Sequence, residues 1–149
     1  MKKSVKKAAS AIADAWPALM SGTDIDFLAK NNITSSQLIT VTTIHFLHKC
    51  SMGQLSKNLQ VTMPTVTGLI DRLIRLKLVT RNKSEEDRRK VYIELTPKGR
   101  SLIGNLQSIV CRKWERLLSA LSAKEVDSFQ NIFRKLKSCI EEQKGKDEA

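Results

Sequence analysis

The sequence predicts a mainly α-helical protein that contains one small β-hairpin. Apolar residues recur at three- and four-residue spacing through most of the 149 residues, which is the period of helices packed on a core. In the segment 91–95, Val91, Ile93 and Leu95 alternate with Tyr92 and Glu94, as residues do in a half-buried strand. Several expected helix starts carry Ser or Thr followed three residues later by Gln or Glu, the pattern of a capping box.

The first two helices are expected over residues 3–30 and from Thr34 to about Lys49. Pro17 should kink or divide the first of them, because proline removes a backbone donor and clashes with the preceding turn. Thr34 and Gln37 have capping-box spacing for the second. Its β-branched run ITVTTI has low helix propensity, so a strand is the alternative there.

Two short helices joined by a tight turn should follow. Ser51 and Gln54 form another capping pair, and Thr62 caps the next helix, with Pro64 in its first turn. This last helix has one apolar stripe and a polar, basic outer face. The arrangement is that of a helix-turn-helix, although an ordinary helical hairpin in a bundle would give the same pattern.

A hairpin is expected next, with strands over residues 78–81 and 91–95 and a charged loop over 82–90. A helix-turn-helix followed by such a hairpin is the plan of a winged helix. Thr96 and Pro97 then start a long helix that reaches about Leu121, and Ser122 with Glu125 starts the last helix. Both helices carry apolar stripes that one winged-helix lobe is too small to cover, so we expect a dimer.

Composition restricts the class of protein. The formal net charge of +11 indicates an anionic partner, either nucleic acid or a membrane surface, unless the charge serves only solubility. No segment is long enough to cross a bilayer, and Asp14 and Pro17 interrupt the apolar part of the N-terminus, so no secretion signal is expected. Three widely spaced cysteines fit a reducing cytoplasm. We therefore expect a cytoplasmic protein without a membrane partner.

Motifs for catalysis and metal binding are missing from the sequence. There is no glycine-rich phosphate loop, no His-Glu-x-x-His and no nucleophile elbow. His45 and His48 could share a metal, but Cys50 is not at a helical partner position, so an ordinary histidine pair is favoured. We expect no enzyme activity, no catalytic residues, no metal and no cofactor.

The segment 65–99, TVTGLIDRLIRLKLVTRNKSEEDRRKVYIELTPKG, resembles the signature of the MarR family of bacterial transcription regulators. The shared points are a helix that ends in Leu-Val-x-Arg, Asp-Arg-Arg in the wing, Leu-Thr-x-x-Gly at the next helix, and their spacing. The resemblance implies a homodimer with residues 1–34 and 97–149 as the dimerisation region and 35–96 as the winged helix-turn-helix. It also implies a regulator, taken as a repressor, that leaves its operator in response to a small ligand or oxidation.

One residue departs from the family pattern. Relatives usually have a small residue where Lys77 stands, at the end of the recognition helix, and glycine there accepts a left-handed conformation without strain. Lys77 must either adopt that conformation or end the helix differently, so the helix end is uncertain.

The expected partner is double-stranded DNA with a pseudo-palindromic operator. The N-terminal part of the helix that begins near Met63 should face the major groove, where threonines can contact bases and Gly68 permits close approach. The predicted DNA-binding residues are Thr62, Met63, Pro64, Thr65, Thr67, Gly68, Arg72, Arg75, Arg81, Asp87, Arg88, Arg89 and Lys90.

Asp87 is the unexpected member of this set. Residues 71–100 contain ten bases and five acids, a net charge of +5, so an acid beside three bases needs a reason. A wing arginine can enter the narrow minor groove, and a neighbouring carboxylate can hold its guanidinium ready. We expect Asp87 to orient Arg89 in this way; an ordinary solvated turn is the alternative.

Regulation is the least determined property. Trp16, Met20, Phe27, His45 and His48 could line a pocket for a small aromatic or amphipathic effector, although residues at this spacing are more often core.

A redox switch is a second candidate form of regulation. Cys50, which follows Lys49 at a helix end, is the best candidate thiol, whereas Cys111 and Cys139 look structural. The alternatives to a ligand-responsive regulator are a thiol-based regulator of the same fold and a helical interaction protein that does not bind DNA.

Overall fold

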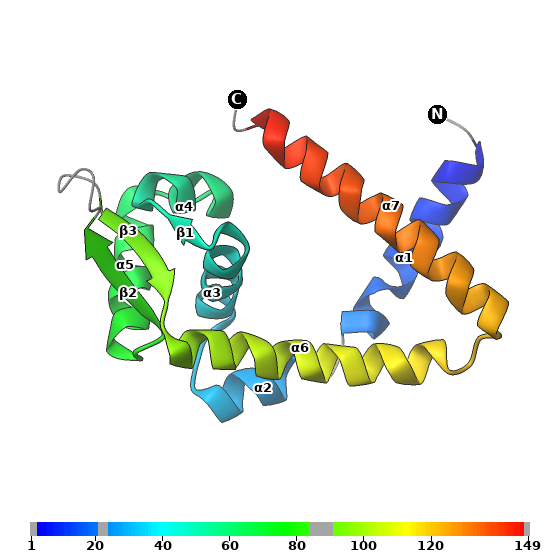
Figure 1. Ribbon diagram of the computed structural model, residues 1–149, viewed down its shortest axis with the longest axis horizontal. Helices are drawn as coiled ribbons and strands as arrows, with labels where there is room; N and C mark the ends of the chain where they lie inside the picture. Colours follow the sequence, from blue (N-terminus) through cyan, green and yellow to red (C-terminus); the bar gives the residue numbers. More distant parts are fainter. Residues whose placement is uncertain (1–2, 21–23, 84–90, 148–149) are drawn as a thin grey trace. The chain divides into compact units, whose positions relative to one another are not determined.

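A computed structural model describes residues 3–20, 24–83 and 91–147 of the chain. These residues form a mainly helical fold with a small antiparallel sheet of strand order β1-β3-β2, which contains the predicted hairpin and one further strand (Figure 1). In chain order the elements are α1 (Lys3–Met20), α2 (Asp24–Asn31), α3 (Ser35–Leu47), β1 (Lys49–Cys50), α4 (Met52–Leu59), α5 (Met63–Arg75), β2 (Val79–Lys83), β3 (Val91–Leu95), α6 (Pro97–Leu118) and α7 (Ala123–Asp147).

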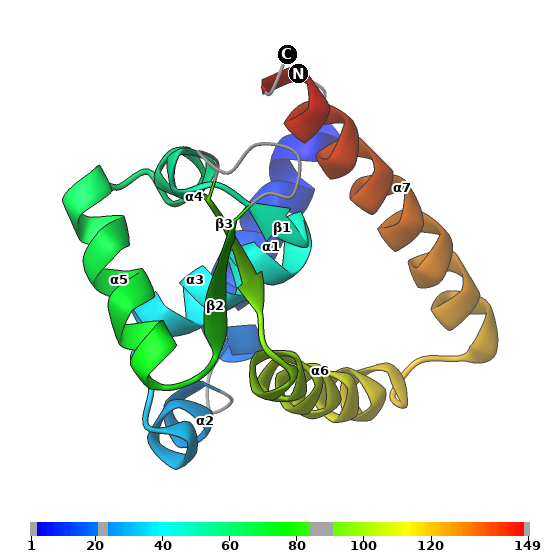
Figure 2. The ribbon, with the colours of Figure 1, turned by 60° about the vertical axis from the view of Figure 1, so that its left-hand side comes forward.

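The chain divides into two compact units, residues 1–109 and 110–149. In the first unit, α3, α4 and α5 gather beside the sheet (Figure 2). One core joins them to the start of α6, and its buried apolar residues are Phe27, Ile33, Val41, Ile44, Cys50, Leu55, Val66, Ile70, Leu73, Leu78, Val79, Ile93, Leu95, Leu102 and Ile103. The predicted inner stripe of α5 thus supplies three core residues.

The β-branched run in the second predicted helix forms α3, not a strand. Its threonine hydroxyls donate to carbonyls one turn earlier: Thr40 to Ser36 O at 2.7 Å, and Thr42 and Thr43 to their own i−4 carbonyls at 2.9 Å. Bonds of this kind satisfy the hydroxyls inside a helix, while Val41 and Ile44 face the core. The predicted capping box of Thr34 and Gln37 is present at its start.

β1 was not predicted, because two residues are too few to show an alternating pattern. α3 ends at Leu47, two residues before its expected end, and His48 takes a positive φ of 59°. The chain then turns so that Lys49 pairs with Glu94 and Cys50 with Ile93 on β3. The other edge of β3 pairs with β2, from Val79 opposite Leu95 to Lys83 opposite Val91. β3 has its predicted bounds, whereas β2 begins one residue later and ends two residues later than expected.

Lys77 adopts the left-handed conformation, with φ 59°. The Lys77 N–H donates to Ile74 O at 2.8 Å and the Leu78 N–H to Leu73 O at 2.9 Å, which is the Schellman pattern of a helix end. A left-handed residue other than glycine costs roughly 1–3 kcal/mol, so its surroundings must hold it in place.

The start of α6 supplies these surroundings. The Thr96 hydroxyl donates to Lys77 O at 2.7 Å, the Thr96 N–H donates to Leu78 O at 3.1 Å, and Lys98 Nζ donates to Leu76 O at 2.9 Å. We call this set of contacts the α6 clamp. Gly99 closes it, because a Cβ at residue 99 would overlap the Leu78 carbonyl oxygen.

Three details of the helix starts and ends differ from the predictions. α1 continues through Pro17 to Met20, since the proline ring disturbs the turn before it and not the residues after it. Thr62 is the N-cap of α5 by position, but its hydroxyl bonds the Thr65 hydroxyl at 2.9 Å and makes no cap hydrogen bond. At the start of α7, the Ser122 N–H donates to the Glu125 carboxylate, as the predicted capping box requires, but the Ser122 hydroxyl donates to the same carboxylate too. Both hydrogen bonds lower the pKa of that carboxyl.

In the second unit, Trp114 and Phe129 lie 5.8 Å apart between ring centroids, and Phe129 stacks on Phe133 at 5.9 Å. Much of the predicted apolar surface is exposed among the described residues: Phe133, Leu136 and Ile140 of the α7 stripe, and Val110, Leu117 and Leu121 of the stripe before it. Ile132 of α7 is exposed as well. Among the described residues, no helix has the length and apolar character needed to cross a membrane.

Two glycines of α6 allow the clamp to be tested. We expect Gly99→Ala to lower the free energy of unfolding by about 2 kcal/mol or more, since the methyl group overlaps a fixed carbonyl. Gly104 has no neighbouring atoms within 4 Å of an added Cβ, so Gly104→Ala should raise it by about 0.5–1 kcal/mol through helix propensity. Urea unfolding of both variants measures the difference; equal effects would contradict the clamp.

Candidate nucleic-acid interface

A short turn fixes α4 and α5 relative to each other. Gln60 has a left-handed φ of 54°, and Val61 N–H donates to Ser56 O at 3.2 Å. The Ser56 hydroxyl returns a 2.6 Å bond to Val61 O. The predicted Ser51–Gln54 capping box closes the other end of α4. The predicted helix-turn-helix is therefore present, with its turn hydrogen-bonded on both sides.

The outer face of α5 begins with exposed, uncharged residues. Met63, Pro64, Thr65, Thr67 and Gly68 are all exposed, and the first turn holds no acid. The Thr67 hydroxyl donates to Met63 O at 2.9 Å, while that of Thr65 bonds the Thr62 hydroxyl. This part of α5 can thus present methyl groups, hydroxyl oxygens and a glycine backbone to the floor of a groove.

The C-terminal half of α5 carries the positive charge. Arg72 and Arg75 are exposed, and among the described residues no carboxylate lies within ion-pair distance of either. Their neighbour Asp71 is occupied, since Arg81 Nη2 lies 2.8 Å from its Oδ1. Arg81 was predicted to contact DNA, which stays a prediction; in the structure its guanidinium ties β2 to α5. That exposed pair is worth little in stability, but it orients the base of the wing.

The wing base has a second charged group of contacts. Lys49 Nζ lies 3.7 Å from a Glu94 carboxylate oxygen and 4.7 Å from the centroid of the Tyr92 ring. Asn82 donates to the same carboxylate at 3.3 Å. All three strands are thereby joined on the outer face of the sheet. The wing residues Asp87, Arg88, Arg89 and Lys90 lie outside the described residues, so the predicted Asp87–Arg89 pairing stays a prediction.

The five predicted effector residues have different surroundings. Phe27 is only 4% exposed and belongs to the core of the first unit, as the alternative interpretation expected; its use as a ligand contact stays a prediction. Trp16 on α1 is 54% exposed, and the Met20 side chain lies outside the described part. The ring centroids of His45 and His48 lie 6.5 Å apart at the end of α3. The described residues contain no cluster of three metal-ligating side chains.

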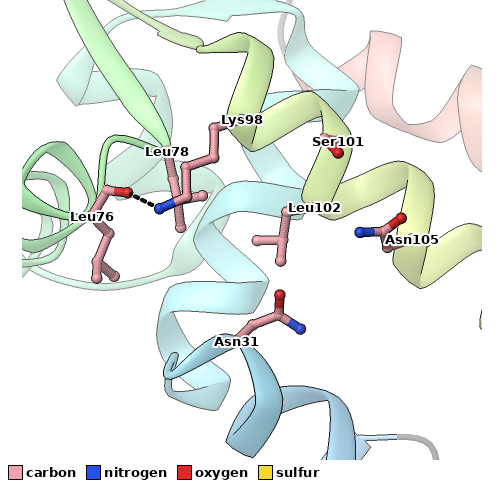
Figure 3. A pocket seen from close by; sticks show the side chains of 7 residues that line it. All are labelled: Asn31, Leu76, Leu78, Lys98, Ser101, Leu102 and Asn105. Carbon is pink, nitrogen blue, oxygen red and sulfur yellow. Dashed lines mark hydrogen bonds between the residues drawn. The ribbon is translucent and has the colours of Figure 1, made fainter.

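A different set of residues lines a cavity of about 210 Å³ beside the α6 clamp (Figure 3). Figure 3 shows Lys98 reaching across to Leu76, with polar side chains on the far wall. The lining residues are Asn31, Leu76, Leu78, Lys98, Ser101, Leu102 and Asn105. The volume is below the range for drug-sized ligands, so a bound molecule would have to be small.

Cys50 does not meet the conditions for a redox switch, which corrects the prediction. β1 turns its side chain into the core, where the residue is fully buried and Sγ lies 3.8 Å from Ile93 O. Burial raises the pKa of the thiol from 9.0 to about 11. Cys111 and Cys139, expected to be structural, are exposed in the chain. A hydrogen bond to Glu115 raises the pKa of Cys111, so its thiol is not activated either.

Known proteins are similar to this chain in sequence and in fold. The sequence pattern described as the MarR family matches residues 33–91. An uncharacterised HTH-type transcriptional regulator of Bacillus subtilis (strain 168), YsmB, is 30% identical over 114 residues, which cover 74% of this chain and 76% of YsmB. The HTH-type transcriptional repressor YetL of the same organism is 35% identical over 82 residues, covering 55% of this chain and 49% of YetL.

Solved structures extend the likeness over most of the chain. The S. aureus MepR–DNA complex is similar with a TM-score of 0.67 and 28% identity, covering 88% of this chain and 98% of MepR. The transcriptional regulator Tm0710 from Thermotoga maritima is similar with a TM-score of 0.74 and 25% identity, over 95% and 97% of the two chains.

The burial of Cys50 has a direct chemical consequence. In a protein with Cys111→Ser and Cys139→Ser, we expect iodoacetamide at pH 8 to react with folded Cys50 at least about a hundredfold more slowly than after unfolding. Raising the thiol pKa from 9.0 to about 11 lowers the fraction of reactive thiolate at pH 8 by about that factor, and burial slows the access of the reagent further. Mass spectrometry of quenched samples gives both rates. Comparable rates in the folded and unfolded states would return Cys50 to the list of candidate sensors.

Proposed function

The chain belongs to the MarR family of transcription regulators, and we propose that it acts as a homodimeric repressor on a pseudo-palindromic operator in double-stranded DNA. The outer face of α5 carries this proposal: exposed, uncharged residues come first, and two arginines follow that have no carboxylate partner among the described residues. An acid-free helix start and free guanidinium groups suit contact with a phosphate-rich duplex. Relatives support the assignment, since MepR is solved with DNA and YetL is a repressor.

DNA contact would then divide among three parts of the lobe. The N-terminal half of α5 enters the major groove, Arg72 and Arg75 hold phosphates, and the wing reaches the neighbouring minor groove. Asp71 and Arg81 position the wing relative to α5. Within the wing, Asp87 orients Arg89 before DNA arrives, as the sequence led us to expect.

Dimerisation is proposed through the helices that flank residues 35–96. The exposed apolar residues of α7 line one face, because Phe133, Leu136 and Ile140 are three and four residues apart. A stripe of this size on a lone chain indicates a partner surface, and a second copy satisfies the symmetry of a palindromic site.

Release by a small aromatic or amphipathic ligand completes the proposal. The cavity beside the α6 clamp supports it, because a ligand that drew Lys98 away from Leu76 O would loosen the end of α5. We propose no catalytic role, and the family consists of regulators rather than enzymes. The thiol-based alternative is less well supported, since Cys50 is buried.

Selection of bound duplexes from a random DNA pool tests the function. We expect a pseudo-palindrome with half-site centres about 10 bp apart, one helical turn. Thr65→Ala and Thr67→Ala should change the preferred bases more than the affinity for unrelated DNA, since they alter the part of α5 that meets base edges. Selection with each variant and a gel shift across a salt series measure both effects.

Two results would count against this reading. Failure to enrich any sequence would support the alternative of a helical interaction protein that does not bind DNA. An unchanged motif in both threonine variants would mean that another face of α5 lies in the groove.

The dimer is tested separately. We expect light scattering to give twice the chain mass at micromolar concentration, and Ile140→Glu to weaken the dimer about tenfold or more, because it places a carboxylate in an apolar contact. Gln130→Glu adds the same charge to α7 at an exposed polar residue and should leave the dimer intact. A wild-type monomer would contradict the proposal.

A further inference from the structure

A second cavity of the first unit, a shallow one of about 270 Å³ that is open to solvent, lies where the end of α5 meets the junction of α2 and α3. Its lining residues are Asn32, Gln37, Arg72, Arg75 and Leu76. Four of these five side chains carry N–H donors, and none is a carboxylate. The cavity is therefore built to receive an acceptor with negative charge.

Gln37 is the most buried of the four donors in this cavity, being only 7% exposed. Its Oε1 accepts the Thr34 N–H at 2.9 Å, as the capping box requires. Its side-chain nitrogen has no hydrogen-bond partner among the described residues. Every side-chain nitrogen of these residues that is sealed from solvent has such a partner, so the nitrogen of Gln37 is not sealed. The Gln37 Nε2 therefore reaches solvent, and Gln37 lines this cavity, so both protons of its amide are available to a ligand there.

The two arginines lie on the same face of α5 as the residues proposed to read bases. Thr65, Gly68, Arg72 and Arg75 are spaced by three or four residues, so they form one stripe along the helix. Seven residues separate Thr65 from Arg72, which is roughly 10 Å along the helix axis. The major groove is about 12 Å wide, so a helix that reads bases with Thr65 brings this cavity to the phosphates at its edge.

α3 adds a favourable field. It packs against α5 (Figure 2), and its first turn carries no acid that would repel an anion. The positive end of its dipole, which lies beside Gln37, favours an oxyanion. The nearest acid on α5, Asp71, is paired with Arg81.

We propose that this cavity seats one backbone phosphate in each half-site of the operator, held by Gln37 Nε2 and the guanidinium groups of Arg72 and Arg75. The assignment rests on the proposed function. It makes Gln37, a residue outside the helix-turn-helix and the wing, part of the DNA contact. A free phosphate offers the same oxygens, so the test must separate the two sources.

Gln37→Glu is the sharpest substitution. A carboxylate keeps the oxygen that accepts the Thr34 N–H, so the capping box survives, but it replaces the free amide with negative charge. We expect operator affinity to fall about tenfold or more, with an unchanged or higher melting temperature, since the new carboxylate faces two arginines. Gln107→Glu, at an exposed residue of α6, adds the same charge and should change affinity less than about twofold.

Arg75→Gln provides an independent variant at an exposed residue, where folding is not at risk. It should weaken binding similarly on all sequences and make the log–log salt dependence shallower by about two units, one for each subunit. An unchanged salt slope would overturn the role of Arg75.

Synthetic operators with single methylphosphonate linkages identify the phosphate itself. A methylphosphonate at one position in each half-site should weaken the binding of the wild-type protein. The same methylphosphonate should not weaken the binding of the Gln37→Glu protein any further. The inference would be overturned, with DNA binding intact, if the operator affinity of the Gln37→Glu protein were within twofold of that of the Gln107→Glu control. It would also be overturned if the losses from Gln37→Glu and from the methylphosphonate were fully additive at every phosphate. A wild-type protein that selects no DNA would instead remove the proposed function.

Titration with inorganic phosphate at constant ionic strength separates the free anion from the duplex. We expect no increase in melting temperature at micromolar phosphate. An increase in melting temperature that Gln37→Glu abolishes would assign the cavity to a free anion, provided that neither phosphate nor the substitution changes operator affinity. That result would overturn the role of the cavity in DNA contact.

Discussion

The hydrogen bonds between the start of α6 and the turn that joins α5 to β2 determine how the DNA-facing lobe is arranged. Lys77 is held there in a left-handed conformation, and the carbonyls of residues 76–78 accept bonds from Thr96 and Lys98. Three elements meet at this turn: the helix proposed to read bases, the first strand of the wing and the long helix that leaves the lobe. Any change in the turn would move all three relative to one another, so the clamp couples the proposed reading surface to α6.

The charges of the lobe are arranged so that its acids serve as internal partners. Asp71 holds Arg81, and Glu94 accepts from Lys49 and Asn82. Pairs this exposed contribute little to stability, and their value lies in fixing where strands and helix meet. Because these acids are occupied, the arginines at residues 72 and 75 keep their charge for an outside partner. A high net charge alone would not have distinguished a DNA-binding surface from a merely soluble one.

Burial separates structural residues from candidate regulatory ones in a way that residue type does not. Cys50 and Phe27 have the chemistry of a sensor and of a ligand contact, but both belong to the core of the first unit. Conversely, the apolar residues of α7 are exposed although their spacing is that of a core. In the first case the fold places the side chain in the core; in the second it leaves an apolar surface exposed, which we propose a second copy covers.

The sequence by itself determined the features that depend on residues close along the chain: helix periods, the capping boxes of Thr34 and Ser51, the strand at residues 91–95 and the family signature. These were predictable because side chains three or four residues apart meet in any helix, and alternate side chains share a face in any strand, whatever the rest of the fold does. The tertiary structure alone decided β1, the burial of Cys50, the pairing of Arg81 and the place of Gln37 beside Arg72 and Arg75. Each of these depends on residues brought together from distant parts of the chain, and the local pattern carries no information about which residues the fold will bring.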